Sequence, residues 1–152
     1  MIRPQNCCRL YEEIGQKLAS KDSSSGSVKL FNKGKTAVFK KLAEEAAEVW
    51  MAVRFESQDE LALEISQVWY YLILLSFYYP EDQSEFCIFL GEADKQLLAS
   101  DPSGNLSKSL VHTCVELIRD ENFLSHSKTI FTLSSEIARQ NKVSLADIHS
   151  KL

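Results

Sequence analysis

The chain has 152 residues, 45% of them hydrophobic and 25% charged, and a formal net charge of −4 at pH 7. This length allows one domain or two small ones, and an acidic balance with no dominant basic face argues against a nucleic-acid-binding protein. The longest apolar run, WYYLILLSFYY at residues 69–79, is too short to span a bilayer and indicates a buried helix. The first residues lack the apolar segment of a signal peptide. We therefore expect a cytoplasmic protein with no membrane partner.

Residues 20–35 (SKDSSSGSVKLFNKGK) form a polar segment that predicts a loop before the first long helix. Lys29, Lys33 and Lys35 lie in it, and Lys40 and Lys41 follow on the first helical turns. Contact with solvent alone is the ordinary role of such lysines. The alternative is that some of them contact phosphate groups, a role that suits lysine as a point charge.

Two consecutive helices are predicted from the spacing of apolar residues. In the first, from about residue 37 to 55, the apolar positions recur at helical spacing at Phe39, Leu42, Ala43, Ala46, Val49, Trp50 and Val53. Ser57, followed three positions later by Glu60, has the pattern of a capping box that starts a second helix. Its buried stripe is expected to comprise Leu61, Ile65, Val68, Trp69, Leu72, Leu75 and Phe77. The short link makes the two helices antiparallel neighbours.

Oxygen-bearing side chains occur on both helices at matching distances from the turn. Glu45 and Glu48 are three positions apart on the first helix, and Glu64 and Gln67 are three apart on the second. With a rise of about 1.5 Å per residue, Glu48 lies level with Glu64, and Glu45 lies level with Gln67 one turn further on. Four such side chains can converge on a hard cation such as Mg²⁺, which can in turn hold the phosphates of a nucleotide.

Glutamates on a helix more often form a solvated face than a metal site. Two features of this sequence favour the metal site. Glu44, Glu45 and Glu48 crowd like charges at helical spacing, which is unfavourable unless a cation lies nearby. Glu64 is flanked by apolar residues and lies close to the buried stripe. The residues alone leave both interpretations open.

The segment 34–71, GKTAVFKKLAEEAAEVWMAVRFESQDELALEISQVWYY, resembles phosphoribosyl-ATP pyrophosphohydrolase of histidine biosynthesis. That family belongs to the MazG-like nucleotide pyrophosphohydrolases, in which an EExxE helix and an ExxD helix coordinate Mg²⁺. The resemblance implies an all-α, MazG-like helical bundle with a nucleotide substrate and Mg²⁺, or Mn²⁺ in its place, as cofactor. The implied reaction is hydrolysis of phosphoribosyl-ATP to phosphoribosyl-AMP and pyrophosphate. The alternatives are a house-cleaning (d)NTP pyrophosphohydrolase with the same ligands, and a non-catalytic helical scaffold of the same fold.

The resemblance also assigns roles to individual residues. The implied metal ligands are Glu45, Glu48, Glu64 and Gln67, the implied catalytic residues are Glu44, Glu45, Glu48 and Glu64, and the implied substrate-binding residues are Lys29, Lys33, Lys35 and Lys41. Gln67 departs from the motif, because most of the superfamily has Asp at that position. A Gln carbonyl can still ligate a hard cation, but it brings no charge and cannot act as a base.

The rest of the chain predicts a second, degenerate copy of the first part. YEEIGQKLAS (11–20) matches GEADKQLLAS (91–100), and KKLAEEAAEVW (40–50) matches KSLVHTCVELI (108–118), which aligns Glu48 with Glu116. The positions that match Glu44, Glu45, Glu64 and Gln67 are His112, Thr113, His126 and Thr129. Chance similarity between helical segments is the alternative.

We therefore predict a catalytic MazG-like repeat at residues 1–80 and a degenerate repeat without the acidic motif at residues 81–152. The family works as dimers, so the chain is expected either to form a homo-oligomer or to act as a fused pseudo-dimer within one chain. In the second case the degenerate half is expected to cover the apolar surface of Trp50, Trp69, Tyr70 and Tyr71.

The cysteines and histidines give no functional signal in the sequence. Cys7, Cys8, Cys87 and Cys114 form no CxxC pair, so neither a metal site nor a disulfide is predicted. The histidines lie near no candidate nucleophile in sequence, and we expect surface or hydrogen-bonded roles for His112, His126 and His149.

Overall fold

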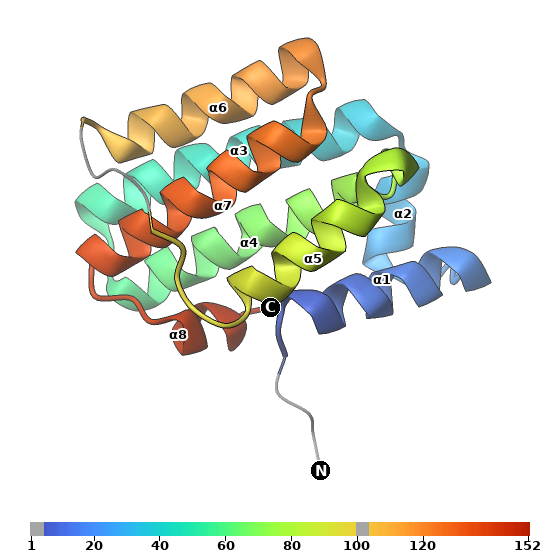
Figure 1. Ribbon diagram of the computed structural model, residues 1–152, viewed down its shortest axis with the longest axis horizontal. Helices are drawn as coiled ribbons and strands as arrows, with labels where there is room; N and C mark the ends of the chain where they lie inside the picture. The colour runs from blue at the N-terminus through green and yellow to red at the C-terminus, as the bar shows by residue number, and fades with distance from the viewer. Residues whose placement is uncertain (1–4, 100–103) are drawn as a thin grey trace.

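The computed structural model describes residues 5–99 and 104–152, and this part of the chain is helical, without any strand (Figure 1). The prediction of an all-α fold is confirmed. The helices are α1 (Cys7–Ser20), α2 (Gly26–Asn32), α3 (Lys35–Phe55), α4 (Gln58–Ser76), α5 (Gln83–Ala93), α6 (Leu106–Asp120), α7 (Phe123–Gln140) and α8 (Leu145–His149), with a 3₁₀ turn η1 (Pro80–Asp82) before α5. Residues 1–4, which bear on the signal peptide, and Ser100 of the proposed repeat lie outside the described residues.

The two predicted long helices are α3 and α4, and their break at residues 55–57 is confirmed. The Ser57 hydroxyl accepts a hydrogen bond from the backbone N–H of Glu60 at 3.2 Å, so Ser57 is the N-cap of α4. The predicted stripe of α4 is buried from Leu61 to Leu75, and only Phe77, just past the helix, is partly exposed. On α3, Trp50 belongs to the apolar series but is 38% exposed.

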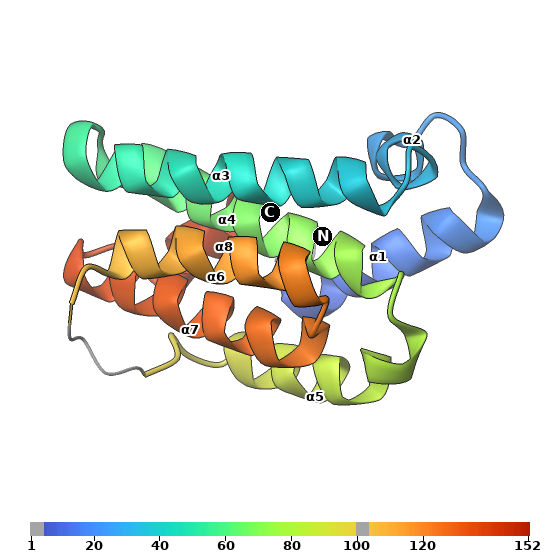
Figure 2. The same cartoon turned by 90° about the horizontal axis from the view of Figure 1, so that it is seen from above.

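Helix α4 is the centre of the molecule, because it packs against α1, α3, α7 and α8. The hairpin of α6 and α7 lies alongside the hairpin of α3 and α4 (Figure 2), with α6 against α3 and α7 against α4. Trp69 on α4 donates from Nε1 to the Ser134 hydroxyl of α7 at 2.8 Å and stacks on Phe131 at a ring separation of 5.0 Å. The two halves therefore share one hydrophobic core.

The segment 20–35 is not the loop that its polar composition predicts, because it contains α2. Ser25 caps this helix by accepting a hydrogen bond from the N–H of Val28 at 3.4 Å. The side chain of Val28 is buried, and the ring of Phe31 stacks on Tyr78 at 4.2 Å. These contacts with distant parts of the chain stabilise a short helix that local composition does not reveal.

The proposed match between residues 11–20 and 91–100 does not extend to their secondary structure. Residues 11–20 are helical throughout in α1, whereas α5 ends at Ala93 and residues 94–99 are not helical. The match rested on shared letters and not on a shared apolar period, which is the stronger signal for a helix.

By length and hydropathy, no single helix in the described residues qualifies as a membrane span, although Gln58–Ser76 and Pro80–Ala93 do so as a pair bent by 107°.

Candidate active site

Of the acidic residues predicted from the sequence, Glu45 of α3 and Glu64 of α4 lie next to each other, and Glu48 lies near them. The carboxyl group of Glu64 on α4 hydrogen-bonds to that of Glu45 on α3, and the charge of Glu48 acts on Glu64 as well. Glu45 and Glu64 are half-buried, whereas Glu48 is exposed. The neighbour of Glu64 on α3 is therefore Glu45. The sequence predicts instead that Glu48, one helical turn further along, lies level with Glu64.

The crowding of these carboxylates changes the protonation of Glu64. Burial, the hydrogen bond to Glu45 and the charges of Glu45, Glu48 and Glu56 raise the pKa of Glu64 from 4.5 to about 8. Each of these causes favours the neutral carboxylic acid over the carboxylate. No ion pair reaches Glu45, Glu48 or Glu64 from elsewhere in residues 5–99 and 104–152. The site is thus a group of acidic side chains without a neutralising side chain.

Glu44 and Gln67 lie at the margins of this group. Glu44 is exposed and forms an ion pair with Lys41 at 3.6 Å. Gln67 follows Glu64 by one turn on α4 and lines a groove with Ser66, Tyr70, Lys151 and Leu152. Gln67 therefore lines the same groove as the C-terminal residues Lys151 and Leu152.

The four lysines assigned to substrate binding occupy different settings. Lys29 and Lys33 are exposed on α2 and at its C-terminal end, and no ion pair engages them within the described residues. Lys41 is paired with Glu44. Lys35 forms an ion pair with Glu121 and lies 5.4 Å from the centre of the Tyr79 ring. Lys35 is thus held at the link between α6 and α7.

Tyr71 is a member of the site that the sequence analysis did not single out as a functional residue. Burial raises the pKa of its hydroxyl, and the charges of Glu45 and Glu44 raise it further, so the Tyr71 side chain lies beside these acids. Its ring meets that of Tyr70 edge-on at 5.0 Å, and the Tyr70 hydroxyl hydrogen-bonds to Ser27 of α2. The signal available in the sequence was its position seven residues after Glu64, which places both on one face of α4.

Comparison with known proteins identifies the family. The chain is 44% identical over 66 residues to the phosphoribosyl-ATP pyrophosphatase of Salinibacter ruber, an alignment that covers 43% of this chain and 76% of that protein. It is 47% and 45% identical over 64 residues to the phosphoribosyl-ATP pyrophosphatases of Streptomyces avermitilis and Streptomyces coelicolor, covering 41% of this chain and 71% of each relative. The chain belongs to the phosphoribosyl-ATP pyrophosphatase family.

Membership in this family makes the protein a pyrophosphohydrolase. The alignments leave more than half of the chain without a counterpart in these phosphoribosyl-ATP pyrophosphatases. No family model and no solved structure matches the chain. A span of 66 residues cannot contain both the α3–α4 hairpin and the α6–α7 hairpin, which pack against each other.

Proposed function

We propose that this protein hydrolyses phosphoribosyl-ATP to phosphoribosyl-AMP and pyrophosphate at the acidic group of α3 and α4. The observation that carries the proposal is that Glu45 and Glu48 of α3 lie near enough to Glu64 of α4 to raise its pKa, in a chain of this family. The relatives' names give the substrate, and the acidic group gives this chain a place where a nucleotide triphosphate with its cation can bind.

The donor set fits a hard divalent cation, Mg²⁺ or Mn²⁺. Glu45, Glu48 and Glu64 offer carboxylate oxygens and Gln67 offers an amide oxygen, and these are the donors such cations take in proteins. The raised pKa of Glu64 reflects repulsion among the carboxylates, and a cation among them would relieve it. When bound, such a cation polarises a phosphoryl oxygen and lowers the pKa of the attacking water.

The protein's own residues hold the reactants and move one proton. Glu45, Glu48 and Glu64 would hold the cation beside the triphosphate. Glu44 is exposed at the margin of the site and accepts the proton that the attacking water loses. The oxygen of the water forms a bond to the α phosphorus. The bond between that phosphorus and the oxygen that bridges it to the β phosphorus breaks, and pyrophosphate leaves with the bridging oxygen.

The lysines near the site are proposed to bind the phosphates of the substrate. The hydrogen bond between Ser27 and Tyr70 fastens α2 beside the acidic group, which supports this role for the exposed Lys29 and Lys33. Lys41 lies one turn before Glu45 on α3 and can exchange Glu44 for a phosphate. Lys35 would have to leave Glu121 to take part.

We further propose that residues 1–80 form the catalytic MazG-like repeat and that residues 81–152 form a degenerate repeat that replaces a second subunit. The packing of α6 and α7 against α3 and α4 supports this arrangement. So does the cover that Phe131 and Ser134 provide for Trp69. Trp50 stays exposed, so the cover is incomplete on α3.

The test is pyrophosphate release by the purified chain from phosphoribosyl-ATP and from each dNTP, over a range of Mg²⁺ concentrations. We expect Mg²⁺-dependent release with the highest kcat/KM on phosphoribosyl-ATP. Glu45→Gln keeps the shape of the side chain and removes its charge, and it should abolish release. A higher kcat/KM on a dNTP would assign a house-cleaning function. No release from any nucleotide by the wild-type chain would favour a helical scaffold without activity.

A further inference from the structure

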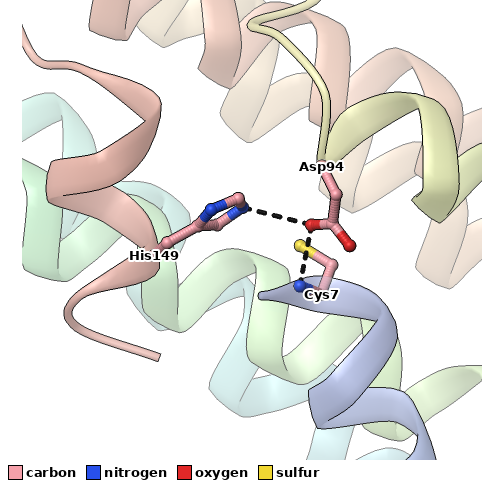
Figure 3. A group of neighbouring side chains, drawn as sticks. All are labelled: Cys7, Asp94 and His149. Atoms are coloured by element: carbon pink, nitrogen blue, oxygen red, sulfur yellow. Dashed lines mark hydrogen bonds and ion pairs between the residues drawn. The ribbon is translucent and has the colours of Figure 1, made fainter. Parts of the chain in front are cut away.

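Three potential metal ligands from three separate elements meet where the start of α1 lies near the ends of α5 and α8 (Figure 3). Cys7 is the first residue of α1, Asp94 is the C-cap of α5, and His149 is the last residue of α8. Their ligand atoms all lie within 4.8 Å of one another, a closeness that no other group of Cys, His, Asp and Glu reaches in the described residues. Cys7 is fully buried, and the side chains of His149 and Asp94 are only 16% and 10% exposed.

Nε2 of His149 is buried and lies against Asp94 without a well-directed hydrogen bond. Nε2 lies 3.1 Å from Oδ1 of Asp94, which is an ion-pair distance, yet this buried atom has no hydrogen bond of acceptable geometry. Buried polar atoms of this kind are rare and call for a partner. A proton shared with Asp94 is one solution, and a cation between the two side chains is another.

The carboxylate of Asp94 retains capacity to bind more. Its two oxygens accept hydrogen bonds from the backbone N–H groups of Cys7 and Cys8, each at 2.8 Å. A carboxylate oxygen has two lone pairs, so each atom can take a further partner. Burial opposes the charge on Asp94, but His149 and these N–H groups outweigh it and lower the pKa of the carboxyl group. Asp94 is thus an anion held in place at the centre of the group.

The thiol of Cys7 is protonated while no cation is bound. Burial, followed by the charge of Asp94, raises the pKa of the Cys7 thiol well above its usual value. A coordinated divalent ion reverses this preference, because a coordinating thiol loses its proton.

We propose that Cys7, Asp94 and His149 bind a Zn²⁺-class transition-metal ion, separately from the acidic site of α3 and α4. A thiolate, an imidazole and a carboxylate are the ligands that Zn²⁺ combines in proteins. Sulfur and imidazole select against Mg²⁺, which prefers oxygen alone. The two sites of the chain would therefore sort two kinds of cation by ligand chemistry.

The bound ion acts as a structural clip. It joins the start of α1, the end of α5 and the short helix α8, and the His149 ring rests edge-on against the buried Trp69 of α4 at 6.5 Å. The clip therefore fastens elements from both ends of the chain over the central helix. Binding to the folded state alone raises the apparent stability of that state.

The proposal is tested by adding Co²⁺ to the full chain after treatment with a chelator. We expect the thiolate-to-cobalt charge-transfer band and the intense d–d bands of tetrahedral coordination, at one ion per chain, and their loss when Zn²⁺ is added. Cys7→Ser should remove the charge-transfer band, and His149→Gln should weaken Co²⁺ binding. Cys114→Ala and His112→Ala change a thiol and an imidazole outside the group and should leave the spectrum unchanged.

Thermal unfolding gives a second measurement that does not depend on activity. Zn²⁺ should raise the Tm of the wild-type chain and of Glu48→Ala equally, and should leave the Tm of His149→Gln unchanged. The wild-type titration decides the matter even if a variant fails to fold. A cobalt spectrum without a thiolate band, together with an unchanged Tm, would show a metal-free clasp and overturn the proposal. Full bands in both Cys7→Ser and His149→Gln would also overturn it, because the ion would then bind elsewhere.

Discussion

The two helical hairpins at the centre of this protein have the same construction but differ in the pairing of their charged side chains. Glu56 and Ser57 join α3 to α4, and Glu121 and Asn122 join α6 to α7, so both links are two residues long. Both hairpins contribute to one core and lie side by side (Figure 2). The difference between them lies in how their acidic side chains are partnered.

In the α6–α7 hairpin the acidic side chains have partners. The Arg119 guanidinium donates from Nε to Glu116 at 2.9 Å, and Nε2 of His126 lies 3.0 Å from Asp120. In the α3–α4 hairpin no ion pair reaches Glu45 or Glu64 from the described residues, and burial together with the neighbouring glutamates raises the pKa of Glu64. The α6–α7 hairpin thus folds with its acidic side chains paired. In the α3–α4 hairpin the charged form of Glu64 is disfavoured, and perturbed carboxylates of this kind are common at functional sites.

The α6–α7 hairpin nevertheless keeps a hollow on its surface. His112, Thr113 and Thr129, which align with Glu44, Glu45 and Gln67, line one groove together with Lys108 and neighbouring residues. The side chains in this groove include no carboxylate. The comparison teaches that two helical hairpins of similar build can differ in the acidic side chains they present, and that only the α3–α4 hairpin carries the donor set of the proposed cation site.

The largest expected effect is on pyrophosphate release, and it distinguishes a glutamate of the α3–α4 hairpin from the matched glutamate of the α6–α7 hairpin. Glu48→Ala should lower Mg²⁺-dependent pyrophosphate release by about 100-fold or more, because even partners of metal ligands contribute about 10–100-fold. Glu116→Ala removes the aligned glutamate of the other hairpin and should leave release unchanged. The measurement is kcat/KM on phosphoribosyl-ATP for both variants. Equal losses would mean that the α6–α7 hairpin is not the inactive member of the pair.

The second prediction concerns the contact that ties the hairpins together. Ser134→Ala leaves the buried Nε1 of Trp69 without an acceptor and should lower the free energy of unfolding by about 1–3 kcal/mol. Thr129→Ala removes an exposed hydroxyl of the same helix, and surface changes of this kind stay within about 0.5 kcal/mol. Urea unfolding measures both. If Ser134→Ala is as stable as Thr129→Ala, the α6–α7 hairpin does not support α4 through this bond.

Sequence predicted the first hairpin better than the rest because its signals are local. The apolar period of α3 and the cap at Ser57 depend on residues within a few positions of one another, and both are confirmed. Two antiparallel helices of known rise place the glutamates of α3 and α4 at similar distances from the turn. The exact partner of Glu64 did not follow, because a glutamate side chain can reach across a helical turn.

The features that sequence did not predict depend on distant contacts. Helix α2 is stabilised by packing such as that of Phe31 on Tyr78. Cys7, Asp94 and His149 come from three segments with no shared motif, so their spacing carries no signal. The same holds for Trp50, since its exposure depends on where α6 lies against α3 and not on the period of α3 itself.

The third prediction is a pH dependence of stability that arises in the α3–α4 hairpin. Folding raises the pKa of Glu64 from 4.5 to about 8, so the folded state favours the protonated side chain. The resulting stabilisation is complete below the unfolded value and is lost as the pH rises through about 8. Thermal unfolding of the metal-free chain should therefore show a falling Tm between about pH 5 and pH 9.

Glu64→Gln provides the control for this pH dependence, since its amide does not titrate. Its Tm should vary less over the same range, and Mg²⁺ at high pH should restore stability to the wild-type chain more than to this variant. Identical curves for the two proteins would remove Glu64 from the acidic group.

The smallest effect is expected at Gln67 of the α3–α4 hairpin, beside the proposed ligands. Gln67→Asp adds a carboxylate at the margin of the acidic group and should tighten Mg²⁺ binding by up to about fivefold, since an exposed charge pair contributes about 1 kcal/mol at most. Thr129→Asp places the same charge at the aligned position of the α6–α7 hairpin, where Glu45 and Glu64 have no counterparts to share a cation. Calorimetric titration with Mg²⁺ should therefore detect tighter binding in Gln67→Asp alone. If both variants gain equally, a single added charge is enough to attract the cation and the arrangement of the other acids is not what selects the site.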